Sequence, residues 1–220
     1  MVRFRDRHEA GVRLAAELPE YAGRDDVYVL ALPRGGVPVG YEVAIALGLP
    51  LDVFVVRKLG VPGHEELAMG AIASGGVRII NDDVVHQFGV TDDVIATTAA
   101  HEQVELERRE RRYRDGRSLP DVRYRTVILV DDGLATGSSM IAAATALRAH
   151  EPARIVVAVP VAAADSCAAL REVADDVICA VTPVFFEAVG AWYDDFTQVT
   201  DDEVHDLLTR ASAAYGRVGR

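Results

Sequence analysis

The sequence predicts a three-layer α/β/α fold built on a five-stranded, mainly parallel central sheet. Five short apolar runs recur along the 220 residues, at 27–32, 51–56, 126–130, 154–161 and 176–181. The runs are continuously apolar rather than alternating, which is typical of strands covered on both faces of a parallel sheet. Helix-like segments separate several of them, at 37–48, 138–149 and 163–172. This alternation of strands and helices indicates βαβ units.

The segment before the first strand predicts a surface helix. Phe4, Gly11, Leu14 and Leu18 can share one helical face, so we expect that face to dock on the domain. Acidic residues among its arginines distinguish the segment from a transit peptide. It also lacks the apolar stretch of a secretory signal.

The interval between the second and third strands is long and has two parts. Residues 59–76 are rich in glycine, with apolar side chains between them, so we expect an irregular mobile loop that closes over a site. A polar helix follows, from Thr91 or Asp92 to about Gly116. Its last turns mix arginines with glutamates, which favours a solvated face over a basic binding arm.

Aromatic residues gather after the last strand. They are Phe185, Phe186, Trp192, Tyr193 and Phe196. Each of them taken singly is more typical of a core position than of a ligand contact. We expect the whole chain, 1–220, to be a single domain with a core over about 24–181. Residues 182–200 would form a small hood, to which the N-terminus is a candidate contributor.

Charge and composition limit the function classes. A net charge of −11 and a pI near 5.0 argue against a nucleic-acid partner, which would need a basic face. An anionic small substrate stays compatible, because a local pocket can be positive on an acidic protein. The most apolar run, VVAVPVAAA, is too short to span a bilayer, so we expect no membrane partner.

The two cysteines, Cys167 and Cys179, lie in apolar surroundings at a spacing that fits no metal site. We expect reduced core residues in a cytoplasmic protein, with a disulfide as the alternative.

The stretch TVILVDDGLATGSSM, residues 126–140, carries the main functional signal. The chain has seven Asp-Asp pairs, so a pair by itself indicates only a turn or cap. Asp131 and Asp132, however, directly follow a predicted buried strand, and ligands of open parallel sheets bind beyond the strand ends. A loop of small residues then leads to a helix start near Ser138, where backbone N–H groups and the helix dipole favour an anion. Carboxylates beside an anion cradle match a ribose phosphate.

Other phosphate-binding motifs fit this loop less well. A Walker A loop needs a lysine before its Ser/Thr, whereas Gly137 precedes Ser138 here. The G-x-G-x-x-G spacing of dinucleotide sites is absent as well. A plain strand–turn–helix with a glycine-containing turn is the remaining alternative.

The string VILVDDGLATGSS resembles the 5-phosphoribosyl-1-pyrophosphate (PRPP) signature of type I phosphoribosyltransferases. That signature has four apolar residues, two acidic residues, a short spacer, Thr-Gly and small hydroxyl residues. ALPRGGVPVG (31–40) resembles the family's pyrophosphate loop, in which a non-proline cis peptide is frequent. VFVVRKLG (53–60) resembles the Arg-Lys pair that follows the second strand in its adenine-type members. Residues 59–76 and 182–200 occupy the places of the mobile catalytic loop and the base-covering hood.

The resemblance implies a role for each matching residue. Asp131 and Asp132 would be catalytic, holding the ribose hydroxyls and contacting Mg²⁺ through water. The 5-phosphate would bind Gly133, Leu134, Ala135, Thr136, Gly137, Ser138 and Ser139. The pyrophosphate would bind Arg34, Gly35, Gly36, Arg57 and Lys58, of which Arg57 and Lys58 would also be catalytic. The base would meet Phe186, Trp192 or Tyr193. The structural alternative is that Arg34, Arg57 and Lys58 are ordinary solvated cations and that Gly35 and Gly36 only make a tight turn.

The implied reaction transfers ribose 5-phosphate from PRPP, with Mg²⁺, to a nitrogenous base in nucleotide salvage and releases pyrophosphate. Ala135 stands where hypoxanthine/guanine members typically have an aspartate, so the acceptor stays open. A PRPP-binding regulator without turnover and a PRPP hydrolase are alternatives that use the same site. We expect the partners to be PRPP, a nucleobase-like molecule and a second copy of the chain in a cytoplasmic homodimer.

Overall fold

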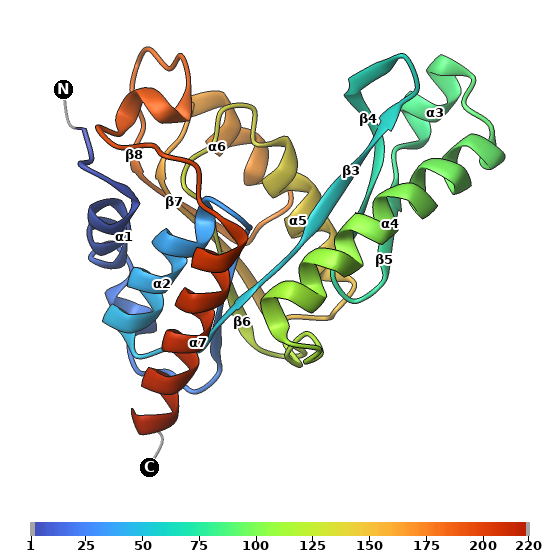
Figure 1. Ribbon diagram of the computed structural model, residues 1–220. Coiled ribbons are helices and arrows are strands. Elements are labelled where there is room, and N and C mark those ends of the chain that lie inside the picture. The colour runs from blue at the N-terminus through green and yellow to red at the C-terminus, as the bar shows by residue number, and fades with distance from the viewer. Residues whose placement is uncertain (1–2, 219–220) are drawn as a thin grey trace.

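The computed structural model describes residues 3–218 and has the predicted three layers, with helices on both faces of a five-stranded parallel sheet (Figure 1). The strands lie in the order β2-β1-β6-β7-β8. Their bounds are β1 Val27–Ala31, β2 Leu51–Val53, β6 Thr126–Val130, β7 Arg154–Val161 and β8 Asp176–Val181. Ala31, at the end of β1, is paired in register with Val53 and Val130, the last residues of β2 and β6. The loops after these three strands therefore leave the sheet at one common edge.

Neighbouring residues of the central strands face opposite helix layers. In β6, Ile128 packs against the layer of α1 (Arg7–Ala15) and α2 (Gly36–Leu47). Leu129 packs on the other face against α5 (Ser138–Arg148) and α6 (Ala164–Leu170). Because both faces of the sheet are excluded from water, every position of this strand is buried and nearly all are apolar, as the sequence pattern predicted. The apolar residues of this segment are buried as expected, with Leu14 of α1 and Leu18, which follows the helix, both in the core.

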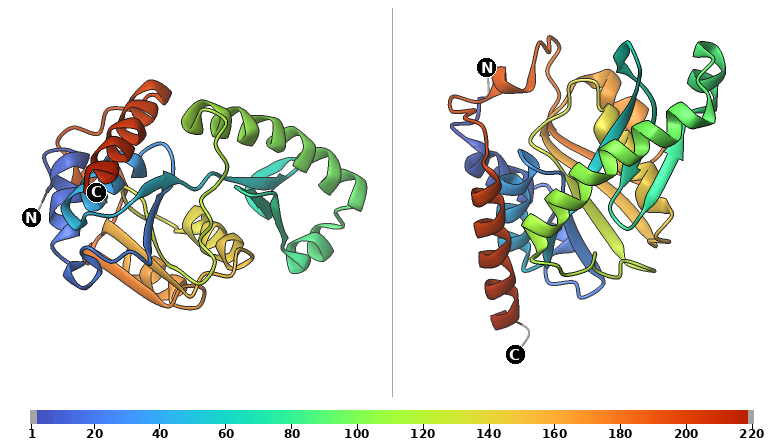
Figure 2. Two further views of the ribbon diagram at one scale, coloured as in Figure 1. Left: turned by 90° about the horizontal axis from the view of Figure 1, so that it is seen from below. Right: turned by 45° about the vertical axis from the view of Figure 1, so that its right-hand side comes forward.

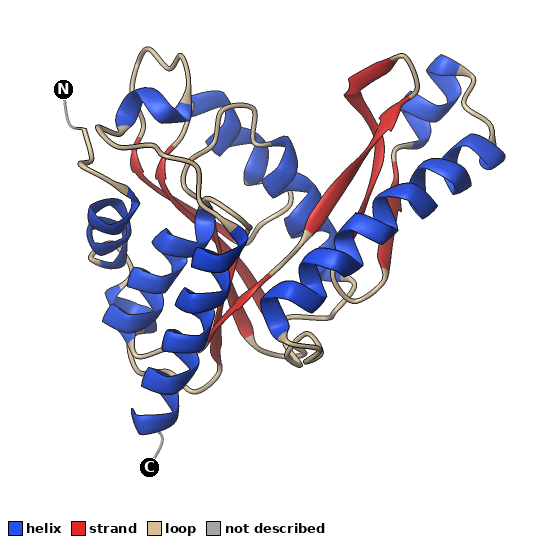
Figure 3. Ribbon diagram, in the orientation of Figure 1, coloured by secondary structure: helices blue, strands red, loops and turns tan. Residues whose placement is uncertain are grey.

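A smaller unit, residues 56–114, projects from the side of the parallel sheet (Figures 1 and 3), and we call it the arm. Its antiparallel sheet contains β3 (Val56–Val61), β4 (His64–Ala73) and β5 (Val77–Ile80). Two helices complete it, α3 (Asp82–Phe88) and α4 (Asp92–Arg114). The predicted polar helix is thus observed as α4.

The expectation of an irregular loop over 59–76 is wrong, because most of these residues belong to β3 and β4. Leu59, Val61, Met69 and Ile72 are buried in one cluster with the apolar face of α4. Backbone pairing together with this burial outweighs the conformational freedom of the glycines.

The segment 182–200, expected to form the hood, contains no strand. The second sheet of the fold, β3-β4-β5, belongs to the arm instead. The segment 182–200 has one 3₁₀ turn, η2 (Val189–Trp192), before a helix that the sequence analysis did not predict, α7 (Asp201–Val218). At the start of α7, the Glu203 N–H donates to Thr200 Oγ1 (3.2 Å) and the Thr200 N–H donates to Glu203 Oε2 (2.7 Å). This reciprocal pair is a capping box. The helix packs beside α2 and α4 (Figure 2).

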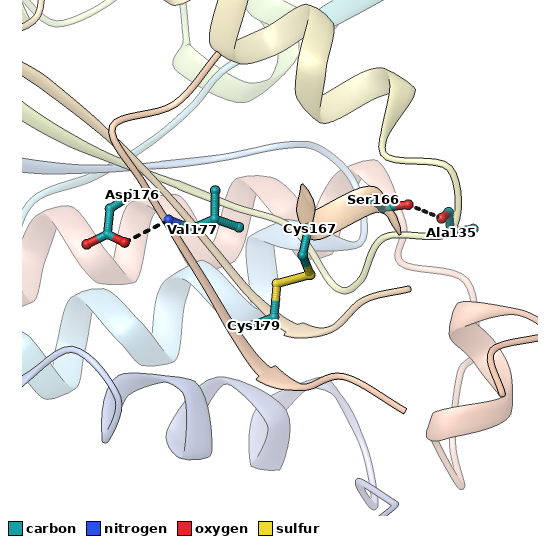
Figure 4. Close-up of a disulfide and its surroundings, with 6 residues drawn as sticks. All are labelled: Ala135, Ser166, Cys167, Asp176, Val177 and Cys179. Carbon is teal, nitrogen blue, oxygen red and sulfur yellow. Dashed lines mark hydrogen bonds between the residues drawn. A yellow bond between two sulfur atoms is a disulfide. The ribbon is translucent and has the colours of Figure 1, made fainter. Parts of the chain in front are cut away.

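The structure pairs Cys167 of α6 with Cys179 of β8 as a disulfide (Figure 4), which is the alternative to the two reduced cysteines that we expected. Helix α6 packs against β8, which brings their facing side chains together. Within residues 3–218, none of the helices combines the length and apolar character needed to cross a bilayer.

Candidate active site

The loop between β6 and α5 forms a small pocket of about 220 Å³. It is lined by Asp131, residues 133–140 and Val189. Gly137, the N-cap of α5, has φ of 71°, a left-handed conformation that suits glycine. Thr136 Oγ1 lies 3.1 Å from Ser138 Oγ, so both hydroxyls are held at the helix start. The free N–H groups of the first turn and the helix dipole make this pocket favourable for an anion.

Contacts with β7 and α6 fix the shape of this loop. The Leu134 N–H donates to the Val161 carbonyl (2.9 Å), and the Ala163 N–H donates to the Leu134 carbonyl (3.1 Å). Ser166 Oγ donates to the Ala135 carbonyl at 2.5 Å (Figure 4). Ser166 could not be predicted from the sequence, since no local pattern relates it to a loop 31 residues away. Because its backbone is anchored on two sides, the pocket is preorganised.

Asp131 lines this pocket and Asp132 follows it in the chain, and both residues are partly buried. The Asp132 N–H donates to Asp131 Oδ1 at 2.9 Å, which orients the first carboxylate. Burial, with the adjacent Asp132 carboxylate as a second cause, raises the pKa of Asp131 well above its usual range. Burial also raises the pKa of Asp132, against the opposing effect of Arg7. The structure therefore confines two like charges in one poorly solvated place.

Arg7 is a site residue that the sequence analysis missed. Its Nε donates to Asp132 Oδ2 at 2.8 Å, in an ion pair that bridges α1 and the end of β6. The Tyr193 hydroxyl donates to the Asp132 carbonyl at 2.5 Å. The predicted surface helix thus reaches the acidic pair through its first residue.

The loop after β1 approaches the acidic pair closely, and the bond between Pro33 and Arg34 is a cis peptide. A Cβ added at Gly35 would overlap the Asp132 carboxylate, and one at Gly36 would lie 2.7 Å from the Val130 carbonyl oxygen. Only glycine leaves room for this approach. Arg34 lies near the same edge, with its guanidinium 3.8 Å from Asp201.

Arg34, Arg57 and Lys58 each have different neighbours. Arg57 and Lys58 are adjacent in β3, so their side chains point to opposite faces of the arm sheet. Arg57 donates to Glu102 of α4 at 2.7 Å. Lys58 lines a separate pocket of about 230 Å³ between the arm and α5, which also contains Ser138. In this conformation, Lys58 therefore lies on the face of the arm sheet that is directed toward the β6–α5 loop.

The three aromatic candidates of 182–200 are largely core residues. Trp192 and Tyr193 are buried with Phe4, and Phe186 packs half-buried against them. Phe185, by contrast, is 85% exposed.

The acidic pair suits a hard divalent cation. Carboxylate oxygens are preferred ligands of Mg²⁺, which proteins commonly bind through one or two carboxylates together with substrate phosphates. The described part of the chain holds no cluster of three or more His, Cys, Asp or Glu side chains arranged for a metal. Asp131 and Asp132 would therefore contribute only part of a coordination shell.

Similarity to known proteins identifies the family. A family model described as a phosphoribosyl transferase domain matches residues 6–194. Proteins from two strains of Mycobacterium tuberculosis, whose names assign them provisionally as phosphoribosyl transferases, are each 47% identical over 219 residues. The matches cover 100% of this chain and 49% of each relative, so the chain spans about half the length of these curated relatives.

A solved structure has the same fold as this chain. The crystal structure of the protein TT1426 from Thermus thermophilus has a TM-score of 0.84 and 42% identity, covering 94% of this chain and 98% of that one. The family model also spans the three motifs on which the resemblance rested, at 31–40, 53–60 and 127–139. The chain therefore belongs to the phosphoribosyl transferase family.

Proposed function

We propose that this domain uses PRPP and Mg²⁺ to transfer ribose 5-phosphate to a nitrogen of a nucleobase-like acceptor, with release of pyrophosphate, in nucleotide salvage. The observation that supports this most directly is the pocket of residues 133–140 beside Asp131 and Asp132. An anion cradle next to two carboxylates, at the sheet edge reached by Gly35 and Gly36, matches the phosphate, hydroxyls and pyrophosphate of PRPP.

In this proposal each part of the site has one task. The β6–α5 loop, residues 133–139, holds the 5-phosphate, and the two carboxylates accept hydrogen bonds from the ribose hydroxyls. The backbone of Gly35 and Gly36, with Arg34, holds the pyrophosphate. Mg²⁺, when bound, offsets the charge between carboxylates and pyrophosphate. Positive charge that develops on the ribose ring during transfer is then stabilised by the fixed carboxylates.

Closure of the arm would complete the site. Arg57 and Lys58 can act on the pyrophosphate only if β3 moves toward Arg34, because Arg57 faces Glu102 in the present conformation. We therefore propose that the hairpin over 59–76 is the closing element, which excludes water from the reaction. The acceptor would lie under 182–200, and Ala135 offers it no carboxylate. We further propose a cytoplasmic homodimer without nucleic-acid or membrane partners.

Heating the protein with PRPP and Mg²⁺ tests the proposed function. A ligand at about 100 times its Kd adds about 2.7 kcal/mol of stability, which raises the Tm of a domain of this size by about 5–11 °C. Pyrophosphate release is then measured with a panel of nucleobases and with no acceptor. Release that depends on a base supports transfer, whereas equal release without one indicates the hydrolase. Binding without release indicates the regulator. A Tm that rises with unrelated nucleotides but not with PRPP would refute the proposal.

Gly35→Ala is expected to weaken PRPP binding by about 5- to 150-fold. The added Cβ overlaps the Asp132 carboxylate, so either the loop or the carboxylate must move, and such overpacking costs about 1–3 kcal/mol. Gly216→Ala is the control, because a Cβ there meets nothing within 4 Å. Titration calorimetry of PRPP with Mg²⁺ gives the Kd values. Equal Kd values for the two variants would show that the Gly35 loop lies outside the ligand site.

A further inference from the structure

Arg7 is fixed in the site by four groups. Its Nε donates to Asp132 Oδ2 (2.8 Å), and its Nη1 donates to the Thr197 carbonyl (2.9 Å). The guanidinium carbon lies 3.9 Å from the ring centroid of Phe196 and 5.9 Å from that of Tyr193. The Arg7 and Asp132 side chains are only 11% and 14% exposed. An arginine held in this way is not a mobile surface cation.

The position of Arg7 depends on the backbone of the N-terminal segment. The Phe4 N–H donates to the Trp192 carbonyl (2.8 Å), and the Asp194 N–H donates back to the Phe4 carbonyl (2.9 Å). The Asp195 N–H donates to the Arg5 carbonyl (2.8 Å). In Figure 1 the blue N-terminal segment accordingly runs beside the chain that leads into α7. Two segments far apart in the sequence therefore place one guanidinium beside the acidic pair.

The Asp132 oxygen that binds this guanidinium also lies against the loop at Gly35. Asp132 Oδ2, the oxygen that accepts from Arg7, is the atom that a Cβ on Gly35 would overlap. The same oxygen is thus close to both the arginine and the backbone of the loop. Two adjacent carboxylates would repel a diphosphate brought to this place, and the repulsion is stronger where water is excluded. Arg7 offsets one of the two charges at the point where the diphosphate would arrive.

We propose that Arg7 is a positioning residue for PRPP, which orients the Asp132 carboxylate toward the ribose hydroxyls and offsets its charge so that the pyrophosphate can bind beside it. This inference rests on the proposed function, because PRPP is the ligand that brings hydroxyls and a diphosphate to the same carboxylate. Arg7 acts through Asp132, and its effect should be larger for ligands that carry the diphosphate.

The test compares Arg7→Met, Arg7→Gln and Arg7→Lys with the control Arg13→Met. Arg13 is on the same helix, half-exposed and paired with Glu9, away from the acidic pair. The Kd values of PRPP and of ribose 5-phosphate are measured by calorimetry at fixed Mg²⁺. We expect Arg7→Met to weaken PRPP binding roughly 10- to 150-fold, which corresponds to one charged hydrogen bond. The affinity for ribose 5-phosphate, which lacks the diphosphate, should fall several-fold less. Arg7→Lys should recover most of the PRPP affinity, and Arg13→Met should match the wild type.

Each other outcome is also decisive. If the wild type fails to bind PRPP, the proposed function is wrong, and this inference is wrong with it. If the wild type binds PRPP and Arg7→Met binds it equally well, only the inference is wrong. Tighter binding by Arg7→Met would show that Arg7 competes with PRPP for Asp132, which also overturns it. A purely structural role would weaken both ligands equally and resist rescue by lysine. Should Arg7→Met not fold, Arg7→Gln against Arg7→Lys gives the same comparison.

Discussion

Asp131→Asn is expected to weaken binding of PRPP with Mg²⁺ by roughly 10- to 150-fold while making the ligand-free protein more stable at neutral pH. The loss of affinity follows from removal of a charged hydrogen-bond acceptor, worth about 1.5–3 kcal/mol. The gain in stability follows from the position of Asp131, where burial and the neighbouring Asp132 raise the pKa of the carboxyl group. Asparagine keeps an oxygen that can accept from the Asp132 N–H, so the loop geometry is preserved.

The stability effect has a defined pH dependence. The pKa of Asp131 is raised in the folded protein above its unfolded value of about 3.9. The stability associated with the Asp131 carboxyl group is therefore fully present below about pH 3.9. It is lost as the pH rises through the pKa that this group has in the folded protein. Asparagine does not titrate and escapes this loss. Urea denaturation without ligand should show Asp131→Asn more stable than the wild type near neutral pH, with the difference shrinking toward acid.

Asp202→Asn is the matched control for Asp131→Asn. Asp202 also belongs to an Asp-Asp pair, but its side chain is 80% exposed beside Arg112 at the start of α7. Neither PRPP affinity nor stability should change appreciably, because exposed ion pairs contribute about 0–1 kcal/mol. If both variants bind PRPP like the wild type, Asp131 and Asp132 are only another acidic pair in a turn. The proposal that they bind the ribose hydroxyls is then wrong.

Arg114→Met is expected to lower the free energy of unfolding by about 3–5 kcal/mol, or the Tm by about 6–20 °C. The Arg114 side chain is 2% exposed, and it donates to Asp52 at 2.8 Å and to Glu110 at 2.6 Å. It also donates to the Val53 carbonyl at the end of β2. Methionine fills much of the space but leaves two poorly solvated carboxylates without their cation, which is the costly way to break a buried ion pair.

Arg112→Met is the control for Arg114→Met, since Arg112 is on the same helix but is exposed in its pair with Asp202. Thermal and urea denaturation of the two variants give the comparison. Similar small losses would mean that Arg114 is not a structural tie between the arm and the central sheet. We expect a large loss of stability only for Arg114→Met, because Arg114 joins α4 to β2.

The sequence by itself determined the central sheet and the β6–α5 loop of the site. The strands could be predicted because burial on both faces imposes a local signature, a continuous apolar run. The loop could be predicted because its glycines, hydroxyl residues and acidic pair are adjacent in the chain. The helix α7 also has a local signal that the sequence analysis missed, the Thr200-x-x-Glu203 capping box.

Only the tertiary structure decided what each charged side chain does. Among the arginines near the end of α4, Arg112 is exposed as the sequence analysis expected, whereas Arg114 is buried. Arg57 faces Glu102, and Arg7 joins Asp132 across 125 positions of the chain. Local periodicity tells whether a residue faces inward or outward, but not which distant carboxylate it meets. That depends on how helices and loops from different parts of the chain are brought to one edge of the sheet, where burial makes it costly to leave either partner of an ion pair without the other.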